Sequence, residues 1–134
     1  MMGVFRVRVR VFDMKDETQS CAVEMLVDTG SNMAVIPADV VRALKLVPIE
    51  FRTFRLADGN EIGRWVGRVG LSVAGRSTVG EVVLGEAGDG AILGAIPLES
   101  MGLEVDPRTR QLRPTPQYLM AHGRRRAGTV TSSA

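Results

Sequence analysis

Residues 23–32 read Val-Glu-Met-Leu-Val-Asp-Thr-Gly-Ser-Asn, an apolar run that ends on an aspartate followed by small and hydroxyl residues. A strand that delivers a carboxylate into a tight turn places an ionisable group beside low-dielectric surroundings, where its proton affinity can be tuned for acid–base chemistry. Apolar residues also follow the turn, at positions 33–36. Because an ordinary surface turn has polar flanks, the pattern favours a functional role for Asp28 over a plain Asp-Thr-Gly turn.

The length and composition indicate one globular domain. The chain has 134 residues, of which 45% are hydrophobic and 24% charged, enough for a real core but not for two domains. We expect a domain over residues 1–116. Residues 117–134 form a C-terminal tail that is expected to be disordered, because its end lacks periodic apolar residues and is rich in Gly, Arg, Ser and Thr.

Several classes of partner are disfavoured. No apolar window approaches the roughly 18 residues of a membrane span, and the N-terminus alternates charge instead of presenting a signal peptide. We therefore expect a cytoplasmic protein with no membrane partner, and the single Cys21 is compatible with a reducing compartment. The net charge of +2 owes much to Arg124–Arg126, and aromatic residues make up only 4% of the chain. Nucleic acid is consequently not an expected partner.

Strand patterns dominate the first half of the chain. Residues 4–12 alternate apolar residues with Arg6, Arg8 and Arg10, which predicts a strand with one buried face, followed by a turn and an antiparallel return strand over 21–27. The arginines have the spacing to follow a phosphate backbone, but a solvated strand face is the favoured interpretation. A short helix is predicted over 37–46, after Pro37.

The rest of the chain adds hairpins. Strands 51–56 and 61–67 flank Ala57-Asp58-Gly59-Asn60, a strong hairpin signal. Strands 69–73 and 78–84 form a further pair, 91–94 is a short apolar segment, 96–101 reads as helical turns, and 103–105 pairs with 111–113. The predicted fold class is all-β, mainly antiparallel, with one or two short helices.

Three of these motifs, in this order and spacing, resemble the retropepsin-like aspartic proteases, in particular their small bacterial members. The motifs are Val27-Asp28-Thr29-Gly30-Ser31, the hairpin around Ala57-Asp58-Gly59, and Ala91-Ile92-Leu93-Gly94 before a short helix. The resemblance covers about residues 4 to 114. It implies a half-barrel acid-protease fold with one lobe per chain, and an aspartic endopeptidase that acts on extended peptides.

The resemblance also assigns roles to individual residues. Asp28 corresponds to the catalytic aspartate, and Thr29 to the residue that bonds across a dimer to the matching loop of the partner. Substrate contacts are implied for Gly30, Ser31, Asn32, Ala57, Asp58 and Gly59, the last three at the tip of a flap. Support of the active-site loop is implied for Thr29, Gly30, Ile92, Leu93 and Gly94.

The chemistry of this family needs two carboxylates that share one proton. No other aspartate of the chain precedes Thr-Gly or Ser-Gly. The second carboxylate must therefore come from another copy, which predicts a homodimer with the two Asp28 residues at the two-fold axis. The Ser31 hydroxyl is placed to donate a hydrogen bond to the Asp28 carboxylate and so favour its charged form.

The chain lacks the residues that a metal site or a Cys–His nucleophile would need. His122 is the only histidine and Cys21 the only thiol, and the spacing of Glu99, Glu104 and Asp106 matches no ligand pattern, so neither a metal nor another cofactor is expected. Trp65 is interpreted as packing at the base of the hairpin, with pocket lining as the alternative.

Two competing functions remain open. One is a dimeric peptide-binding module of the same fold that does not cleave, and the other, weaker one is a basic nucleic-acid-binding β-protein.

Overall fold

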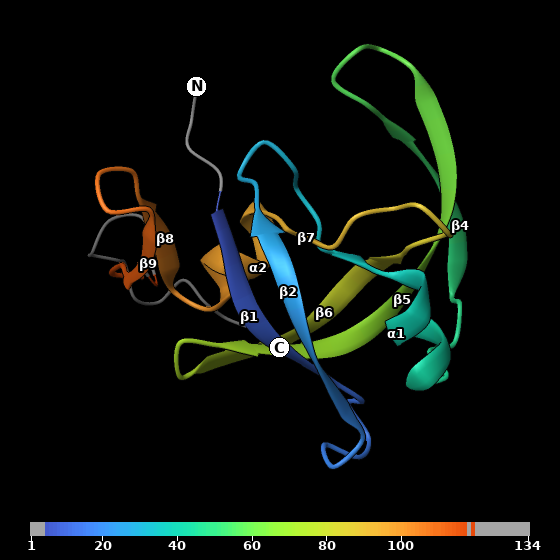
Figure 1. Cartoon of the computed structure of the whole chain (residues 1–134), viewed down its shortest axis with the longest axis horizontal. Coiled ribbons are helices and arrows are strands. Elements are labelled where there is room, and N and C mark those ends of the chain that lie inside the picture. Colours follow the sequence, from blue (N-terminus) through green and yellow to red (C-terminus); the bar gives the residue numbers. More distant parts are fainter. Residues whose placement is uncertain (1–4, 118, 120–134) are drawn as a thin grey trace, which may run out of the picture.

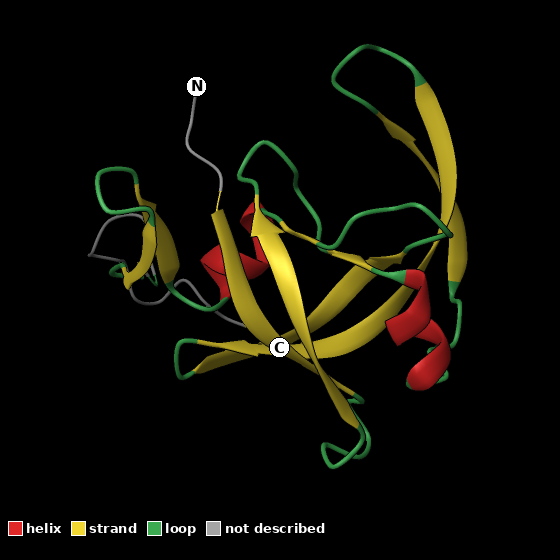
Figure 2. Ribbon diagram, viewed as in Figure 1, coloured by secondary structure: helices red, strands yellow, loops and turns green. Residues whose placement is uncertain are grey.

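The computed structural model describes residues 5–117 and 119. Its elements, in chain order, are β1 (Phe5–Phe12), β2 (Ser20–Val27), β3 (Val35–Ile36), α1 (Ala38–Ala43), β4 (Glu50–Arg55), β5 (Glu61–Val73), β6 (Arg76–Leu84), β7 (Ile92–Leu93), α2 (Ala95–Ser100), β8 (Leu103–Asp106) and β9 (Gln111–Pro114). Strands make up most of the regular secondary structure, and the two helices are short (Figure 2). The prediction of a mainly antiparallel β-protein with one or two short helices is confirmed.

The main sheet closes on itself. Its strand order is β1-β2-β7-β3-β6-β5-β4, and β1 pairs a second time, with β5. This second pairing joins residues 10–12 to residues 70–72, so six strands form a closed ring and β4 is left on its outside (Figure 1). Most pairs are antiparallel, while β2–β7 and β3–β6 are parallel. The β8–β9 hairpin forms a separate small sheet.

The ring closes where an aromatic side chain covers a glycine. Phe12 is buried at the end of β1 and pairs with Gly70 of β5. A side chain at position 70 would collide with the Phe12 ring, and the Arg10 guanidinium lies 4.6 Å from the centre of that ring. Glycine is therefore needed at position 70 for β1 and β5 to meet around this ring.

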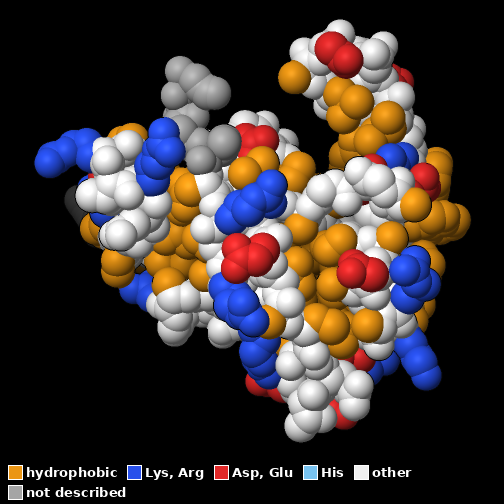
Figure 3. Space-filling model, in the orientation of Figure 1, with side chains coloured by type: hydrophobic (Ala, Val, Ile, Leu, Met, Phe, Trp, Pro, Cys, Tyr) orange, Lys and Arg blue, Asp and Glu red, His pale blue; other side chains and the backbone are white. Residues whose placement is uncertain are grey.

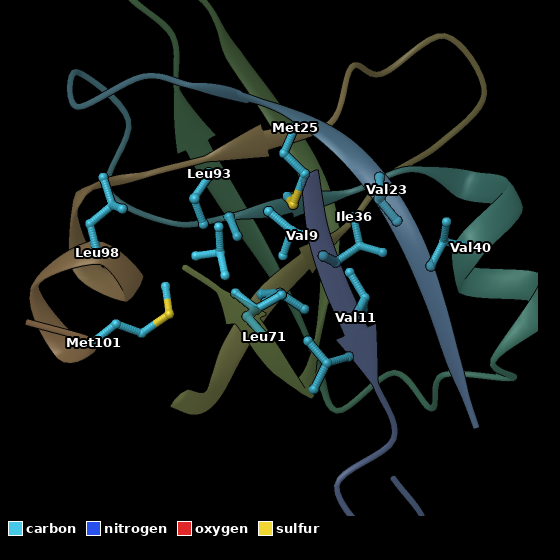
Figure 4. Close-up of a cluster of buried hydrophobic side chains, with 14 of the residues drawn as sticks. Val9, Val11, Val23, Met25, Ile36, Val40, Leu71, Leu93, Leu98 and Met101 are labelled. Atoms are coloured by element: carbon cyan, nitrogen blue, oxygen red, sulfur yellow. The ribbon is translucent and has the colours of Figure 1, made fainter. Parts of the chain in front are cut away.

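The core fills the ring with aliphatic side chains. Val9, Val11, Met25, Ile36 and Leu93 are fully buried, and Figure 4 shows them pointing toward one another from different strands. No polar or charged side chain is buried in residues 5–117. Burial of apolar area is thus the main source of stability in this fold.

Several predicted boundaries need correction. Strands 61–67 and 69–73 are one strand, β5, because Gly67 and Gly70 continue its pairing with β6 without a break. The turn after it is shorter than predicted, so β6 begins at Arg76. The first helix ends earlier, at Ala43, where Leu44 caps it and Lys45 takes a positive φ of 53°.

The predicted β1–β2 hairpin and its alternation are confirmed, with Val9 and Val11 buried and Arg6 and Arg8 exposed. In the described part of the chain, no helix has the length and apolar character to cross a membrane. The prediction for the tail falls almost wholly outside the described residues, as do His122 and Arg124–Arg126. Both the domain boundary and the cytoplasmic location stay predictions.

Candidate active site

Asp28 stands at the first position after β2, half-buried at the start of a tight turn. Its Oδ1 accepts the backbone N–H of Gly30 at 3.0 Å, and its carbonyl oxygen accepts the N–H of Ser31 at 3.1 Å. These two hydrogen bonds close the turn on the aspartate itself. The carboxylate is thereby held in one orientation while part of it stays accessible.

The turn rests on β7 and on the residues that follow it. The backbone N–H of Asp28 donates to the carbonyl oxygen of Leu93 at 3.1 Å. A Cβ at Gly94 would lie 2.5 Å from the carbonyl oxygen of Met33 and 2.6 Å from that of Ser31. Only glycine permits this approach of the two backbones. The structure thus brings Leu93 and Gly94 against the Asp28 turn.

The start of α2 completes this support. The N–H of Ala95 donates to the carbonyl oxygen of Ser31 at 2.8 Å, and the N–H of Ile96 donates to that of Asn32 at 2.9 Å. Two backbone hydrogen bonds thus attach the end of the turn, at Ser31 and Asn32, to the start of α2.

A cleft of about 860 Å³ opens above Asp28. The hairpin of β4 and β5 projects from the body (Figure 1), and the space-filling view shows a hollow between this hairpin and the rest of the molecule (Figure 3). The cleft is lined mainly by apolar side chains, namely Met33, Val35, Phe54, Leu56, Ile62, Val83, Ile92 and Ile96. Such a groove fits an extended apolar ligand.

The predicted site residues divide into two groups. Those that line the cleft are Asp28, Gly30, Ser31, Asn32, Ala57 and Ile92. Those that do not line it in the single chain are Thr29, Asp58, Gly59, Leu93 and Gly94. Thr29 is exposed on the turn, and Asp58 caps the tip of the hairpin by accepting hydrogen bonds from the backbone and side chain of Asn60.

The expected hydrogen bond from Ser31 to Asp28 is not present. Among the described residues, the Asp28 carboxylate accepts a hydrogen bond only from the Gly30 N–H. The tight turn places the Gly30 N–H at the carboxylate, in the role that was expected of the Ser31 hydroxyl. The backbone N–H of Ser31 donates to the carbonyl oxygen of Asp28.

The cleft also contains an ion pair between Arg64 and Asp89 that the sequence did not predict. Arg64 of β5 donates from Nε to Asp89 Oδ2 at 2.7 Å and from Nη2 to Asp89 Oδ1 at 2.9 Å. The hydrogen bonds from Arg64, and a backbone hydrogen bond from Glu86, hold the pKa of Asp89 below its ordinary value. Alternation along β5 does place Arg64 on the same face as Ile62, two residues earlier, but no local signal marks Asp89 as its partner.

Three residues that were considered for other roles have structural ones. Trp65 lies outside the cleft and packs edge-on against Phe51, with ring centres 5.3 Å apart, which confirms packing at the base of the hairpin. Glu104 and Asp106 both pair with Arg113. In the described residues, no group of three potential ligands among His, Cys, Asp and Glu gathers to hold a metal.

Comparisons with known proteins agree with this geometry. A protein-family profile described as "Aspartyl protease" matches residues 7–95. The solution structure of the protease of simian foamy virus (mac) superposes with a TM-score of 0.51 at 17% identity, covering 71% of this chain and 92% of that one.

A retropepsin-like aspartic protease from Rickettsia conorii matches at 22% identity with a TM-score of 0.43, covering 79% of this chain and 95% of that chain. A search of functionally curated proteins gave no significant match. The predicted single-lobed, retropepsin-like fold is confirmed.

Proposed function

We propose that this chain, which belongs to the aspartyl protease family, is an aspartic endopeptidase that acts as a homodimer and hydrolyses peptide bonds of extended peptides. The observation that carries the proposal is the position of Asp28. Its carboxylate is fixed by the Gly30 N–H at the base of a largely apolar cleft beneath a projecting hairpin. A groove of this kind suits a peptide in extended form, with side chains entering apolar pockets.

A second carboxylate is required, and the cleft of one chain does not supply it. Among the described residues, the acidic groups that line the cleft are Asp28 and Asp89. Both Asp89 oxygens accept hydrogen bonds from Arg64, and its pKa is lowered by this pairing. Because both hydrogen bonds stabilise the charged form of Asp89, this carboxylate is poorly suited to take up a proton during catalysis. The second member of the pair would therefore be Asp28 of another copy.

In such a dimer the two carboxylates would share one proton. One carboxylate would take a proton from a water molecule, whose oxygen attacks the carbonyl carbon of the peptide bond. The other would donate its proton to the carbonyl oxygen, giving a tetrahedral diol. The carboxyl group protonated in the first step would then donate its proton to the amide nitrogen, while the other, now ionised, takes a proton from one hydroxyl of the diol. The C–N bond would break, releasing a carboxylic acid and an amine, and the pair would again hold one shared proton.

The remaining predicted site residues have positions that suit their proposed roles. Thr29 is exposed in the single chain, so its hydroxyl is available to the matching turn of a partner. Gly30, Ser31 and Asn32 line the cleft beside Asp28, and Ala57 lines it from the hairpin. We propose that these four contact the peptide backbone, and that Asp58 and Gly59 reach it when the hairpin closes.

The test is peptide cleavage by the full chain and by Asp28→Asn. A peptide library is incubated with each protein across pH, and new termini are identified by mass spectrometry. We expect cleavage to fall by about 10²–10⁴-fold in Asp28→Asn, because an amide cannot act as general base or acid. Asp39→Asn, an exposed change on α1 outside the cleft, is the matched control and should cleave like the wild type.

The shared site is tested by mixing. If wild-type chains exchange into dimers with excess Asp28→Asn chains, each mixed dimer holds one carboxylate and the activity per wild-type chain should fall toward zero. Activity that is unchanged by excess variant would contradict the symmetric site. Peptide binding without cleavage in both proteins would instead favour the silent peptide-binding module.

A further inference from the structure

The Arg64–Asp89 ion pair connects two parts of the cleft that are remote in sequence. Arg64 belongs to β5, two residues after the cleft residue Ile62, and Asp89 belongs to the loop between β6 and β7. Their side chains are only 17% and 23% exposed. Because two parallel hydrogen bonds join a planar guanidinium to a carboxylate, the pair fixes orientation as well as distance.

Asp89 also organises its own loop. Its Oδ2 accepts the backbone N–H of Glu86 at 2.8 Å, and its own N–H donates to the carbonyl oxygen of Glu86 at 2.9 Å. Gly85, just before this turn, is buried so closely that a Cβ there would lie 2.5 Å from the carbonyl oxygen of Ile36. The loop is therefore closed on Asp89 at one end and anchored to β3 at the other.

The loop leads directly to the support of the Asp28 turn. Ala91 accepts the N–H of Leu26 at 2.9 Å through its carbonyl oxygen, and Leu93 accepts the N–H of Asp28. Only Gly90 lies between Asp89 and Ala91, which accepts the first of these bonds. A continuous series of contacts thus runs from the base of the hairpin through Arg64 and Asp89 to the strand that supports Asp28.

We infer that Arg64 and Asp89 are positioning residues that hold the hairpin base at a set distance from the loop before β7 and so fix the width of the substrate cleft. The inference rests on the proposed function. Apolar cleft residues stand on both sides of the pair: Phe54 and Ile62 on the hairpin, Val83 and Ile92 on the body. Arg64 Nη1 also lies 3.6 Å from Glu86 Oε1, so the guanidinium faces two carboxylates of the same loop. The apolar residues on both sides of the pair favour an apolar substrate side chain. Neither member of the pair touches the reacting atoms.

The kinetic test compares Arg64→Met, Asp89→Asn and the double variant with the wild type on a fluorogenic peptide with apolar side chains. We expect KM to rise about tenfold in each single variant while kcat changes less than about threefold, because substrate positioning is lost but the Asp28 pair is intact. The double variant should be no worse than either single variant, since both changes remove the same pair. The KM of Arg64→Lys should lie between those of the wild type and Arg64→Met, because an ammonium keeps the charge but cannot make two parallel hydrogen bonds.

Glu81→Gln is the matched control. Glu81 of β6 pairs with Arg52 at 3.0 Å, outside the cleft, so its loss should leave KM and kcat as in the wild type. A fall in kcat at constant KM, additive single effects, or equal effects in Glu81→Gln would each overturn the inference.

Hydrogen exchange gives a second readout that does not need activity. In Asp89→Asn, the amides of Glu86, Leu26 and Asp28 should exchange at least about tenfold faster than in wild type, while Glu81→Gln leaves them unchanged. If the wild type cleaves no peptide, the proposed function fails, whereas unchanged exchange at these three amides overturns the positioning role itself.

Discussion

The projecting hairpin, residues 50–66, and the base of the cleft, formed by β2, β7 and β3, lie on opposite sides of the same cleft and differ strongly in packing. Every residue of β4 is exposed or half-buried, whereas Val27, Ile36 and Leu93 at the base are at most 2% exposed. A two-stranded arm with few buried contacts opens locally at lower free energy than a packed core. The comparison teaches that the carboxylate is held by the rigid part of the fold and the adaptable part forms the opposite wall.

The largest expected contrast comes from shortening one leucine in each region. Leu93→Ala should lower the free energy of unfolding by about 2–5 kcal/mol, because it leaves a cavity in the core. Leu56→Ala, at a position 42% exposed on the hairpin, should change it by less than about 0.5 kcal/mol. Denaturant unfolding measures both values, and equal losses would contradict the packing difference.

A smaller contrast comes from adding one methyl group. Gly94→Ala should cost about 1–3 kcal/mol, because the new Cβ meets backbone oxygens that cannot move independently. At Gly63 the added Cβ meets only the ring of Phe51, which is 55% exposed and can rotate away. Gly63→Ala should therefore cost less than about 0.5 kcal/mol. Chemical denaturation distinguishes the two, and a larger loss in Gly63→Ala would show that the hairpin is as rigid as the base.

The smallest expected effect is the pH dependence of the stability that the Arg64–Asp89 ion pair adds between the two regions. The hydrogen bonds from Arg64 lower the pKa of Asp89 in the folded protein, so the unfolded chain binds a proton at Asp89 at higher pH than the folded one. The stability that this pairing adds is complete above the ordinary aspartate pKa of about 3.9 and is lost as pH falls through the lowered value.

Unfolding free energies measured from pH 6 down to pH 2 should therefore drop more steeply in the wild type than in Asp89→Asn. Parallel curves would mean that the pair adds no pH-dependent stability.

Local pattern was sufficient for the strands and for the position of Asp28. The alternation in β1 marks its buried face, and the apolar run before Asp28 marks the end of β2, because both are properties of consecutive residues. The supporting role of Gly94 was implied by the resemblance of Ala91-Ile92-Leu93-Gly94 to the retropepsin-like proteases, not by local pattern alone.

Local sequence pattern did not predict the features that depend on contacts between distant segments. Residue 68 was predicted to separate strands 61–67 and 69–73, yet Gly67, Arg68 and Val69 all pair with β6 and keep β5 continuous. Alternation places Arg64 on the same face as Ile62, but only the tertiary fold brings Asp89 against it. Such pairings depend on loop closure and burial that no short window of sequence contains.

The hydrogen bond between the Asp28 N–H and the Leu93 carbonyl oxygen also bears on the synthesis of the chain, because its two partners are far apart in sequence. Asp28 leaves the ribosome long before β7, and until residues 91–94 have emerged the turn has neither the Leu93 carbonyl nor the Gly94 backbone beneath it. Contacts this distant in sequence close a long loop, which carries an entropic cost that local contacts do not have. A nascent or truncated chain that ends before β7 therefore carries the Asp28 carboxylate without the backbone contacts that position its turn, and these contacts become available only with the last strand of the ring.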